Sequence, residues 1–577
     1  MTRAAIHDEA VESVLLLRVL STLIREDVVG LRSRGQLQEE SDGLWLRIPT
    51  ADGKALLVPV EADGFQAVHG ARLPLLRREG DPTGDLITLE AVLATLTELA
   101  DPADRAGFVA FTEECRQTLT TMQLHETARP AIMDRLTARN GDDPARWTGL
   151  GGGVGHDALA ALEDHPVYPT ARGRVGLTEN QLRAYAPEFH ERFGLRWLLL
   201  PRGSVRLSPA VGPVLPGLPS AGDLGFGHYD KSHLAMPVHP LSVGRALDAA
   251  LDEVGLADWA VLVPHQSVEV VPTLSMRTVA RVDRPTEHLK LPLATSTLGL
   301  RNRRTIKPST LADGAAGQRL VQAIIGREPR FRHRVLLADE TRYAHADHEL
   351  LAVLLRRYPE GLERSVVVPL AALLAQAPDG RLLIDHLADR FYGGDPLALL
   401  DAVLTLLFDF QVTLFTYGVA LESHQQNISL VLDERQPPRL LLKDNDGPRV
   451  NRRRLRERGL EADGFADPRT FTDDDAPLAD VFATITVHLC AGAFAFGLAR
   501  HDRAPLPTLL RLVRDRLSVA VERPGAEYLR ARLLDASELP VKAMVSAGTL
   551  LTKERSGAAD TNKHYTTGPN YLRGLDR

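Results

Sequence analysis

Cysteine is scarce in this chain of 577 residues, in which Cys115 and Cys490 are the only two. Two cysteines so far apart form neither a metal-binding spacing nor a disulfide framework. Uninterrupted apolar runs are also short, because none approaches the roughly 18 residues that a membrane-spanning helix needs. The N-terminal segment MTRAAIHDEAVESVLLL is acidic ahead of its apolar residues, unlike the basic start of a signal peptide. We therefore expect a cytoplasmic enzyme or binding protein that does not enter a membrane.

An excess of positive charge is lacking as well. The formal net charge is -7, so bulk attraction to nucleic acid is not indicated. Basic residues do cluster in RVNRRRLRER, from Arg449 to Arg458. This cluster is either a solvated helix face, which we favour, or a patch that faces an anion.

The chain is ordinary in other respects and too long for one core. With 44% hydrophobic and 25% charged residues, it has the composition of a soluble protein of two to four domains. Apolar residues at helical spacing predict helices over 9–28, 87–140, 397–418 and 476–500, the last one buried. Alternating residues predict a hairpin that turns at Asp52–Gly53 and several short strands between 260 and 310. The expected fold class is α+β.

A phosphate-binding glycine loop is not found. The only glycine cluster, LGGGVG from Leu150 to Gly155, is not followed by the Lys-Ser/Thr of a P-loop and does not fit GxGxxG. We interpret it as a flexible joint near a domain boundary.

One hairpin carries candidate metal ligands at its ends. In ESHQQNISLVLDERQPPRLLLKDNDG, Asn427 precedes a predicted strand 428–432, and Asp444 and Asp446 follow a strand 439–443. Paired strands lie ~4.8 Å apart, so these ends meet, and an amide with carboxylates suits Mg²⁺ and nucleotide phosphates. Protein kinases have this layout, but HQQ replaces their catalytic Asp, which disfavours phosphoryl transfer to a hydroxyl. The alternative is that DNDG is only a turn.

A cationic cluster lies upstream of the hairpin. LSMRT places Ser275 and Arg277 on one face of a strand, and HLKLP contributes Lys290. The segment TSTLGLRNRRTIKP adds hydroxyl and cationic groups, namely Thr295, Ser296, Thr297, Arg301, Arg303, Arg304 and Lys307. These groups could bind phosphates and carboxylates together, or they could be charges that protect an exposed edge strand. His165, in EDHPVYPTARGRVG, is an anion contact or a structural loop residue.

Seven segments in order carry a family resemblance: DHPVYPTARGRVG, MPVHP, LSMRT, HLKLP, RRTIKP, ESHQQN and LLLKDNDG. Together they resemble the NRPS-independent siderophore synthetases, the aerobactin-synthetase-like IucA/IucC family. The resemblance implies a cupped hand with a thumb (1–160), a β-rich fingers domain (161–390) and a helical palm (391–577) carrying the hairpin. It also implies an ATP-dependent ligase that adenylates a carboxylate, citrate or a citrate derivative. An amine or alcohol then displaces AMP to form an amide or ester.

The resemblance also assigns roles to residues. Those that resemble ATP contacts are His165, Ser275, Arg277, Lys290, Arg304, Gln426 and Asn427. Those that resemble carboxylate contacts are His424, Arg304, Thr297 and Lys542, of which His424, Arg304 and Lys542 are the catalytic candidates. The magnesium ligands would be Asn427, Asp444 and Asp446. Proximity and electrostatic preorganisation would supply the catalysis, and His424 is also a candidate for deprotonating the amine.

The sequence departs from the family pattern at three places. Tyr168 and Arg172 stand where a second His and a Lys are expected, and the spacing leaves Arg303 as an alternative to Arg304. PVHP continues with Leu241, so His239 is interpreted as structural.

Two other functions remain open: a kinase-like phosphotransferase, and a non-enzymatic protein that binds siderophores or handles iron. A ferric-reductase module would need a cysteine cluster for its iron–sulfur centre. The expected partners are a citrate-like acid and an amine-type nucleophile, without nucleic acid or membrane, and the family implies a homodimer.

Overall fold

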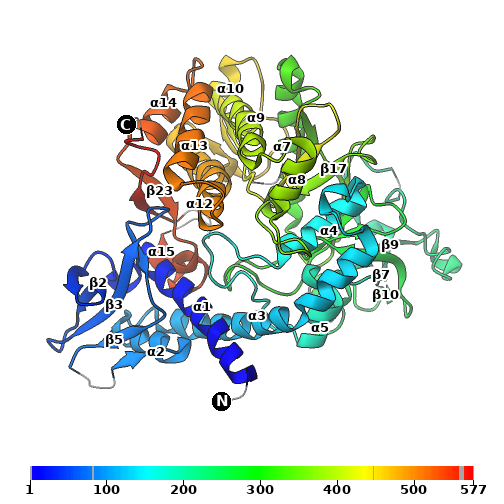
Figure 1. The fold of residues 1–577 in the computed structure, drawn as a ribbon. Coiled ribbons are helices and arrows are strands. Elements are labelled where there is room, and N and C mark those ends of the chain that lie inside the picture. The colour runs from blue at the N-terminus through cyan, green and yellow to red at the C-terminus, as the bar shows by residue number, and fades with distance from the viewer. Residues whose placement is uncertain (1–2, 81–83, 213, 446, 558–563, 576–577) are drawn as a thin grey trace.

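The computed structural model describes residues 3–80, 84–212, 214–445, 447–557 and 564–575. Helices and strands are mixed along the whole chain (Figure 1). The three largest hydrophobic clusters lie in the N-terminal part, around a large middle sheet and among the C-terminal helices. The α+β prediction is therefore confirmed at the level of mixed helix and strand, while the domain limits stay predictions.

The N-terminal part packs helices against a six-stranded sheet. Helix α1 (Arg3–Arg25) buries Leu15, Val19 and Leu23, which confirms the predicted amphipathic helix. The predicted hairpin is the antiparallel pair β2 and β3, with Trp45 opposite Pro59. The strands are β1 (Gln36–Glu40), β2 (Gly43–Pro49), β3 (Ala55–Ala62), β4 (His69–Ala71), β5 (Leu76–Arg78) and β6 (Asp85–Leu86). Helices α2 (Leu89–Leu99) and α3 (Arg105–Asn140) confirm the helical prediction for 87–140.

The interpretation of LGGGVG as a flexible joint is wrong. These residues begin helix α4 (Gly149–Ala161), most of which is buried. A Cβ on Gly152 would lie 2.4 Å from the backbone carbon of Trp147, and one on Gly153 would lie 3.1 Å from the Val367 oxygen. The glycines therefore serve close helix packing, which sequence composition does not distinguish from a joint.

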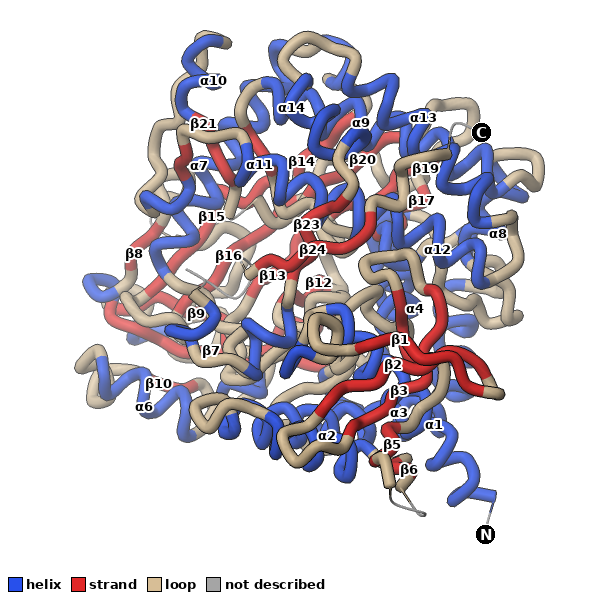
Figure 2. The backbone as a smooth tube through the Cα atoms, turned by 90° about the vertical axis from the view of Figure 1, so that its left-hand side faces the viewer, coloured by secondary structure: helices blue, strands red, loops and turns tan. Residues whose placement is uncertain are grey.

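The middle of the chain forms a nine-stranded, antiparallel sheet (Figure 2). Its strands are β7 (Phe193–Pro201), β8 (Arg206–Leu207), β9 (His233–Val238), β10 (Val261–Leu262), β11 (Ser267–Pro272), β12 (Thr278–Arg281), β13 (Glu287–Lys290), β15 (Asp339–His345) and β16 (Ala352–Arg357). Helices α5 (Glu179–Tyr185), α6 (Arg245–Glu253) and α7 (Pro308–Arg327) lie along this stretch of chain. The predicted short strands between 260 and 310 are confirmed. The prediction that Ser275 and Arg277 lie on one face of a strand is wrong, because β11 ends at Pro272 and the chain turns before β12 begins at Thr278.

The C-terminal part is mainly helical and holds the hairpin. Strands β19 (Ile428–Leu432) and β20 (Arg439–Leu442) are flanked by β17 (Val366–Pro369) and β14 (Val335–Leu337), and β18 (Val419–Ala420), β21 (Arg449–Asn451) and β22 (Phe471–Thr472) form a small sheet. The helices are α8 (Leu383–Phe391), α9 (Pro396–Thr416), α10 (Arg452–Glu457), α11 (Ala476–Val481), α12 (Ala493–Arg500), α13 (Leu506–Val521) and α14 (Glu527–Arg530), with a π-helix (Phe482–Gly492) joining α11 to α12. The predicted helices over 397–418 and 476–500 are confirmed.

Two of these helices are long and apolar enough to cross a membrane. Their most apolar windows, within Pro396–Thr416 and Ala476–Arg500, are 67% and 100% buried inside the protein. They therefore form the core of the C-terminal part.

The end of the chain returns to the N-terminal part. Strand β23 (Glu538–Lys542) pairs with β24 (Tyr565–Pro569), and helix α15 (Lys553–Ser556) follows β23 toward the N-terminal sheet (Figure 1). The buried Glu26, which directly follows α1, accepts the backbone N–H groups of Val545 and Ser546 at 3.1 and 2.7 Å. These bonds let residues beyond 540 contribute to a site formed by the middle of the chain.

Candidate functional site

The two ends of the hairpin lie side by side, as its sequence predicts. Ile428 is paired with Leu442, and the Lys443 N–H donates to the Asn427 carbonyl at 3.0 Å. Asn427 donates through its Nδ2 to the Glu422 carbonyl at 3.1 Å, which leaves Oδ1 as the acceptor end of the amide. Asp444 is the next residue after Lys443, whereas Asp446 lies outside the described residues.

A buried ion pair holds the loop after the hairpin. Glu340 on β15 pairs with Arg356 on β16, and both side chains are only 3% exposed. The same carboxylate accepts the backbone N–H groups of Asp444 and Asn445 at 2.9 and 3.2 Å. Asp444 has a φ of 63°, a left-handed conformation that such bonds help to fix. Glu340 therefore fixes Asp444 and Asn445 in a loop that presents the Asp444 carboxylate.

Asp444 meets the upstream cationic cluster. Lys290, at the end of β13, donates to its Oδ1 at 2.5 Å across 154 residues of sequence. Burial alone would raise the pKa of Asp444, but Lys290, Arg356 and Arg277 together hold it well below its usual range. Strands β12 and β13 lie inside the sheet, so the alternative of an exposed edge strand with protective charges is wrong.

Two histidines near this pair are held neutral. Burial lowers the pKa of His165 to about 3, with His424 and Arg18 adding to the effect. Burial also lowers the pKa of His424 to about 4, and Lys542 and Arg304 contribute while Glu422 and Asp444 oppose. The His165 Nδ1 accepts backbone N–H groups at 3.0 and 3.2 Å, and the His424 Nδ1 accepts one at 3.3 Å. In each neutral ring Nε2 therefore carries the proton and can donate it to an anion.

Arg304 and Lys542 complete the surroundings of His424. Both act electrostatically on its imidazole, and Lys542 lies 3.7 Å from the Glu422 carboxylate. Arg303 points elsewhere and pairs with Glu349 at 2.8 Å.

The other predicted site residues lie near these groups in sequence. The Ser275 hydroxyl accepts a hydrogen bond from the Thr278 hydroxyl at 3.4 Å. The Thr297 N–H donates to the Asn302 carbonyl at 3.3 Å. Gln426 supplies the backbone N–H that the His424 Nδ1 accepts.

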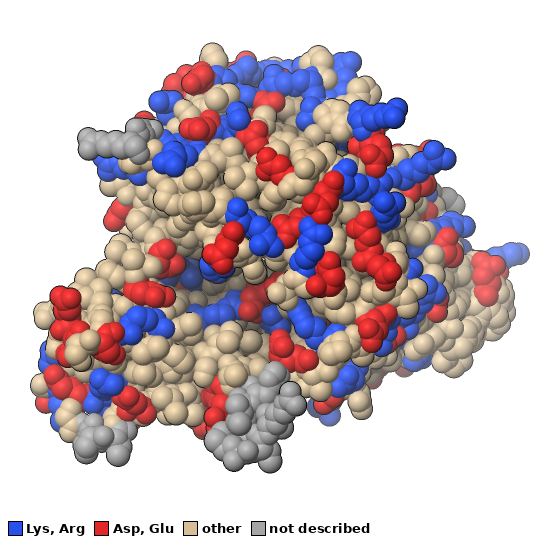
Figure 3. Space-filling model, in the orientation of Figure 1, with Lys and Arg blue, Asp and Glu red and all other residues tan. Residues whose placement is uncertain are grey.

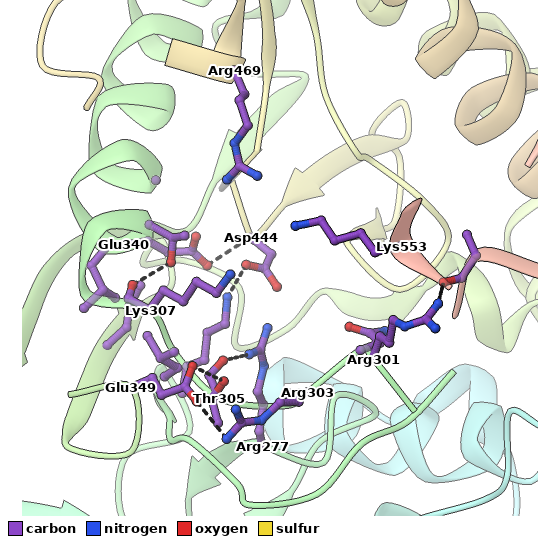
Figure 4. A pocket seen from close by; sticks show the side chains of 18 of the residues that line it. Arg277, Arg301, Arg303, Thr305, Lys307, Glu340, Glu349, Asp444, Arg469 and Lys553 are labelled. Atoms are coloured by element: carbon purple, nitrogen blue, oxygen red, sulfur yellow. Dashed lines mark hydrogen bonds and ion pairs between the residues drawn. The ribbon is translucent and has the colours of Figure 1, made fainter. Parts of the chain in front are cut away.

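One cavity of about 590 Å³ adjoins this constellation (Figure 4). Of the predicted site residues, Arg277, Lys290 and Asp444 line it, whereas His165, Ser275, Thr297, Arg304, His424, Gln426, Asn427 and Lys542 do not. Its other ionisable lining residues are Arg301, Arg303, Lys307, Glu340, Glu349, Arg469 and Lys553. In the space-filling view, acidic and basic side chains are mixed over the outer surface, and basic groups are visible in a central hollow (Figure 3).

The donor set at the hairpin fits a magnesium ion that a nucleotide helps to bind. An amide oxygen from Asn427 and a carboxylate from Asp444 are the oxygen ligands that Mg²⁺ prefers. Among the described residues, no group of three or more His, Cys, Asp or Glu side chains could hold a metal. Phosphate oxygens and water would therefore have to complete the coordination.

Sequence reasoning missed several groups around the cavity. Glu340 and Arg356 lie on strands β15 and β16, Glu349 lies in the connection between these strands, and Lys553 lies outside every recognised segment. Nothing in the sequence relates these residues to the hairpin, because only the tertiary fold brings them together.

The departures from the family pattern have structural roles. Tyr168 is fully buried and donates to Glu114 at 3.0 Å, and Arg172 donates to Asp164 at 2.8 Å. His239 is buried against Tyr185 and Phe193.

Several arginines of the basic cluster at 449–458 contact other residues of the protein. Arg454 pairs with Asp475 at 2.6 Å, while Arg452 and Arg458 stack on Phe471 and Tyr417. Among the described residues, these contacts favour a structural face over a patch for an anion.

Comparison with known proteins agrees with the resemblance found in the sequence. Residues 157–375, which include His165 and the cationic cluster, match the IucA / IucC family. The resemblance to the IucA/IucC family is therefore confirmed. Residues 398–556 match a family described as ferric iron reductase FhuF-like transporter.

Similar proteins span almost the whole length of the chain. Staphyloferrin B synthase of Staphylococcus aureus is 22% identical over 600 residues, covering 97% of both chains. The crystal structure of the petrobactin biosynthesis protein AsbB of Bacillus anthracis has a TM-score of 0.78 at 18% identity, covering 99% of this chain and 96% of AsbB. ATP-bound aerobactin synthetase IucA of Klebsiella pneumoniae has a TM-score of 0.69 at 18% identity, covering 97% and 100%. The two structures establish the fold that the chain shares with them.

Proposed function

We propose that this protein is an ATP-dependent ligase of siderophore biosynthesis that adenylates citrate or a citrate derivative. An amine or alcohol then reacts with the acyl adenylate to form an amide or ester. The observation that carries the proposal is the meeting of Arg277 and Lys290 from the middle sheet with Asp444 from the hairpin at one cavity. The match of residues 157–375 to the IucA/IucC family and the siderophore synthases among the similar proteins support the same conclusion.

The nucleotide end of the site consists of the cationic cluster and the hairpin. Ser275, Arg277, Lys290 and the Nε2–H of His165 would bind the phosphates of ATP, with Gln426 nearby. Mg²⁺ held by Asn427 and Asp444, with Asp446 as a further candidate, would neutralise the phosphates and favour departure of pyrophosphate. Lys290 would then exchange its contact with Asp444 for a contact with phosphate.

The carboxylate end of the site consists of His424, Arg304, Lys542 and Thr297. A carboxylate oxygen of the acid attacks the α-phosphorus, and pyrophosphate leaves with the electron pair of the broken P–O bond. Arg304 and Lys542 would hold the two anions close together, since unassisted charge repulsion would keep them apart. The neutral His424 donates from Nε2, so we assign it to binding and orienting the acid rather than to taking a proton.

In the second step the acyl group stays in the position in which the acyl adenylate formed. The neutral nitrogen or the hydroxyl oxygen of the nucleophile attacks the acyl carbon, and the C–O bond to AMP breaks with its electron pair. The proton of the nucleophile passes to solvent. No protein nucleophile is required, in keeping with two cysteines that are buried and separate.

Several further properties follow from this assignment as proposals. We propose a thumb, fingers and palm arrangement that encloses the cavity, a homodimeric assembly and a cytoplasmic location where ATP is available. The FhuF-like match covers the hairpin and the C-terminal helices, but an iron–sulfur centre held by cysteines needs several of them close together. We therefore favour the ligase over an iron-handling protein, and the HQQ sequence ahead of Asn427 disfavours a kinase.

Trapping the acyl adenylate tests the proposal directly. The protein is incubated with ATP, Mg²⁺ and hydroxylamine, with citrate, succinate and 2-oxoglutarate in separate reactions. Hydroxamate, AMP and pyrophosphate with one acid are the expected products. ADP as the nucleotide product would overturn the ligase in favour of a phosphotransferase.

Asp444→Asn should lower this activity by about 10² or more, because the variant loses a charged ligand for the metal. Asp433→Asn is the matched control, since Asp433 lies at the opposite end of the same hairpin and pairs with Arg439. Equal rates in the two variants would argue against a role for Asp444 in the chemistry.

A further inference from the structure

The cavity has a surplus of positive charge. Seven basic and three acidic side chains line it, contributed by the middle sheet, the loop before α7, the segment after the hairpin and the C-terminal segment. The family resemblance assigns a role to only two of these basic groups, Arg277 and Lys290. The remaining basic groups are Arg301, Arg303, Lys307, Arg469 and Lys553.

The three carboxylates at the cavity already have cationic partners within the protein. These pairs are Glu340 with Arg356, Glu349 with Arg303 at 2.8 Å, and Asp444 with Lys290 at 2.5 Å. Glu349 additionally accepts a hydrogen bond from the Thr305 hydroxyl at 3.1 Å. Among the described residues that line the cavity, no carboxylate is therefore left to receive an ammonium group.

Two lysines at the cavity lack such partners. Among the described residues, neither Lys307 nor Lys553 forms an ion pair, and both side chains are exposed. Figure 4 shows them extending toward Asp444 from opposite sides, Lys307 from the loop before α7 and Lys553 from the start of α15.

Arg301 adds directional donors on the side of Lys553. It uses one guanidinium nitrogen to donate to the Ala547 carbonyl at 2.8 Å. Its backbone N–H donates to the Gly548 carbonyl at 3.1 Å, so the loop is fixed to the segment that precedes Lys553. Other N–H groups of Arg301 remain to contact a ligand, because a guanidinium has five.

We propose that the nucleophile of this ligase is an amine that carries a carboxylate, such as a diamino acid, and that Lys553 and Arg301 bind that carboxylate. The inference rests on the proposed function and adds the class of the second substrate. A simple diamine or polyamine would bring a second ammonium group to Lys553 and Arg301, which would repel it, and every described carboxylate that lines the cavity already has a cationic partner. A carboxylate would gain charge-assisted hydrogen bonds in the same place.

The same surplus of charge suits the chemistry. Cations around a bound ammonium group lower its pKa, which favours loss of the proton before attack. The neutral nitrogen then forms the C–N bond to the acyl carbon, AMP leaves with the electron pair of its C–O bond, and the second nitrogen proton goes to solvent. The products are the amide and AMP.

Matched amines that differ only in the carboxylate test the inference. After the hydroxylamine assay has identified the acid, L-ornithine is compared with putrescine and L-lysine with cadaverine. Amide formation is followed by mass spectrometry and AMP release. We expect kcat/KM for each amino acid to exceed that for its diamine by about tenfold or more.

Reversing the charge of Lys553 tests whether this side chain causes the preference for the amino acid over the diamine. Lys553→Glu should lower the ratio of kcat/KM for amino acid over diamine by about tenfold or more. Lys54→Glu is the matched control, because Lys54 is an exposed lysine in the β2–β3 turn and does not line the cavity. It should leave the ratio unchanged.

The possible failures can be told apart. Equal or better use of the diamines, or a ratio unaffected by Lys553→Glu, overturns the inference while the hydroxamate still supports the ligase. Hydroxamate without amide from any carboxylate-bearing amine overturns it as well. Absence of hydroxamate with every acid overturns the proposed function itself, and the inference with it.

Discussion

At the residue scale, Arg303 and Arg304 are neighbours in sequence with different surroundings. Arg303 is largely exposed and pairs with Glu349, whereas Arg304 is half-buried and lowers the pKa of His424. The family pattern alone left the choice between them open, because the spacing fits either residue. The surroundings of His424 favour Arg304 as the residue that contacts the acid.

Substituting each arginine in turn tests this assignment. Arg304→Ala should raise the KM for the carboxylic acid by about 10- to 100-fold, because a charge-assisted contact is worth ~1.5–3 kcal/mol. Arg303→Ala should change it by less than about threefold, as expected for an exposed ion pair. Initial rates of pyrophosphate release at varied acid concentration give both values. A larger effect at Arg303 would reverse the assignment.

At the scale of elements, one buried carboxylate joins four segments of the chain. Glu114 on α3 accepts hydrogen bonds from Tyr168 at 3.0 Å, Thr170 at 2.5 Å and Thr549 at 2.8 Å. Burial raises the pKa of Glu114, although these hydroxyls and the Gly299 N–H oppose the effect. The network fixes the loop that carries Arg301 against the segment that precedes Lys553. Tyr168, as a donor to the same carboxylate, therefore helps to hold in place two segments that line the cavity.

Glu114→Gln should therefore lower the free energy of unfolding by about 1–3 kcal/mol, since the amide NH₂ cannot accept these bonds. Urea denaturation measures the change. Glu113→Gln is the matched control, because Glu113 is exposed on the same helix and pairs with Arg116. Its effect should stay within about 0.5 kcal/mol. Equal losses would show that the buried network adds no stability.

The glycines of α4 offer a second test at this scale. Gly151→Ala should stabilise the protein by about 0.5–1 kcal/mol, because an added Cβ there meets open space and alanine favours helix. Gly152→Ala should instead destabilise it by about 1–3 kcal/mol, because the Cβ would clash with the Trp147 backbone. Thermal unfolding of the two variants compares them. A flexible joint, in contrast, would tolerate both substitutions.

At the scale of the whole molecule, buried histidines govern the response to acid. Burial lowers the pKa of His165, His190 and His239 to about 3 and that of His424 and His488 to about 4. In the unfolded chain these rings titrate near ~6.5. Between these values the unfolded state binds more protons, so the free energy of unfolding falls as the pH falls.

Each of these histidines should cost about 2 kcal/mol of stability at pH 5. Buried carboxyl groups with raised pKa values, such as Glu26, oppose this change because they take up protons in the folded state. We expect a net loss between pH 6.5 and 5 because the histidines are more numerous. Urea unfolding followed by tryptophan fluorescence at pH 7, 6 and 5 measures it. A stability that is flat or rises on acidification would contradict this expectation.

The sequence by itself determined the local elements and the order of the site segments. Helices α1, α3 and α9 and the hairpin β19–β20 follow from spacing and turn residues, which act over a few positions. The hairpin also predicted that Asn427 and Asp444 would be neighbours, because paired strands bring their ends together. The family resemblance rested on the same short segments.

Only the tertiary structure decided which distant charges meet. Lys290 reaches Asp444 across 154 residues, and Glu340 and Arg356 hold the Asp444 loop from a different sheet. The LGGGVG segment became a packed helix because Trp147 and Val367 approach its glycines, and Lys553 reached the cavity because Glu26 anchors Val545 and Ser546. Such contacts depend on the packing of separate elements, and the pattern of residues within any one element does not encode them.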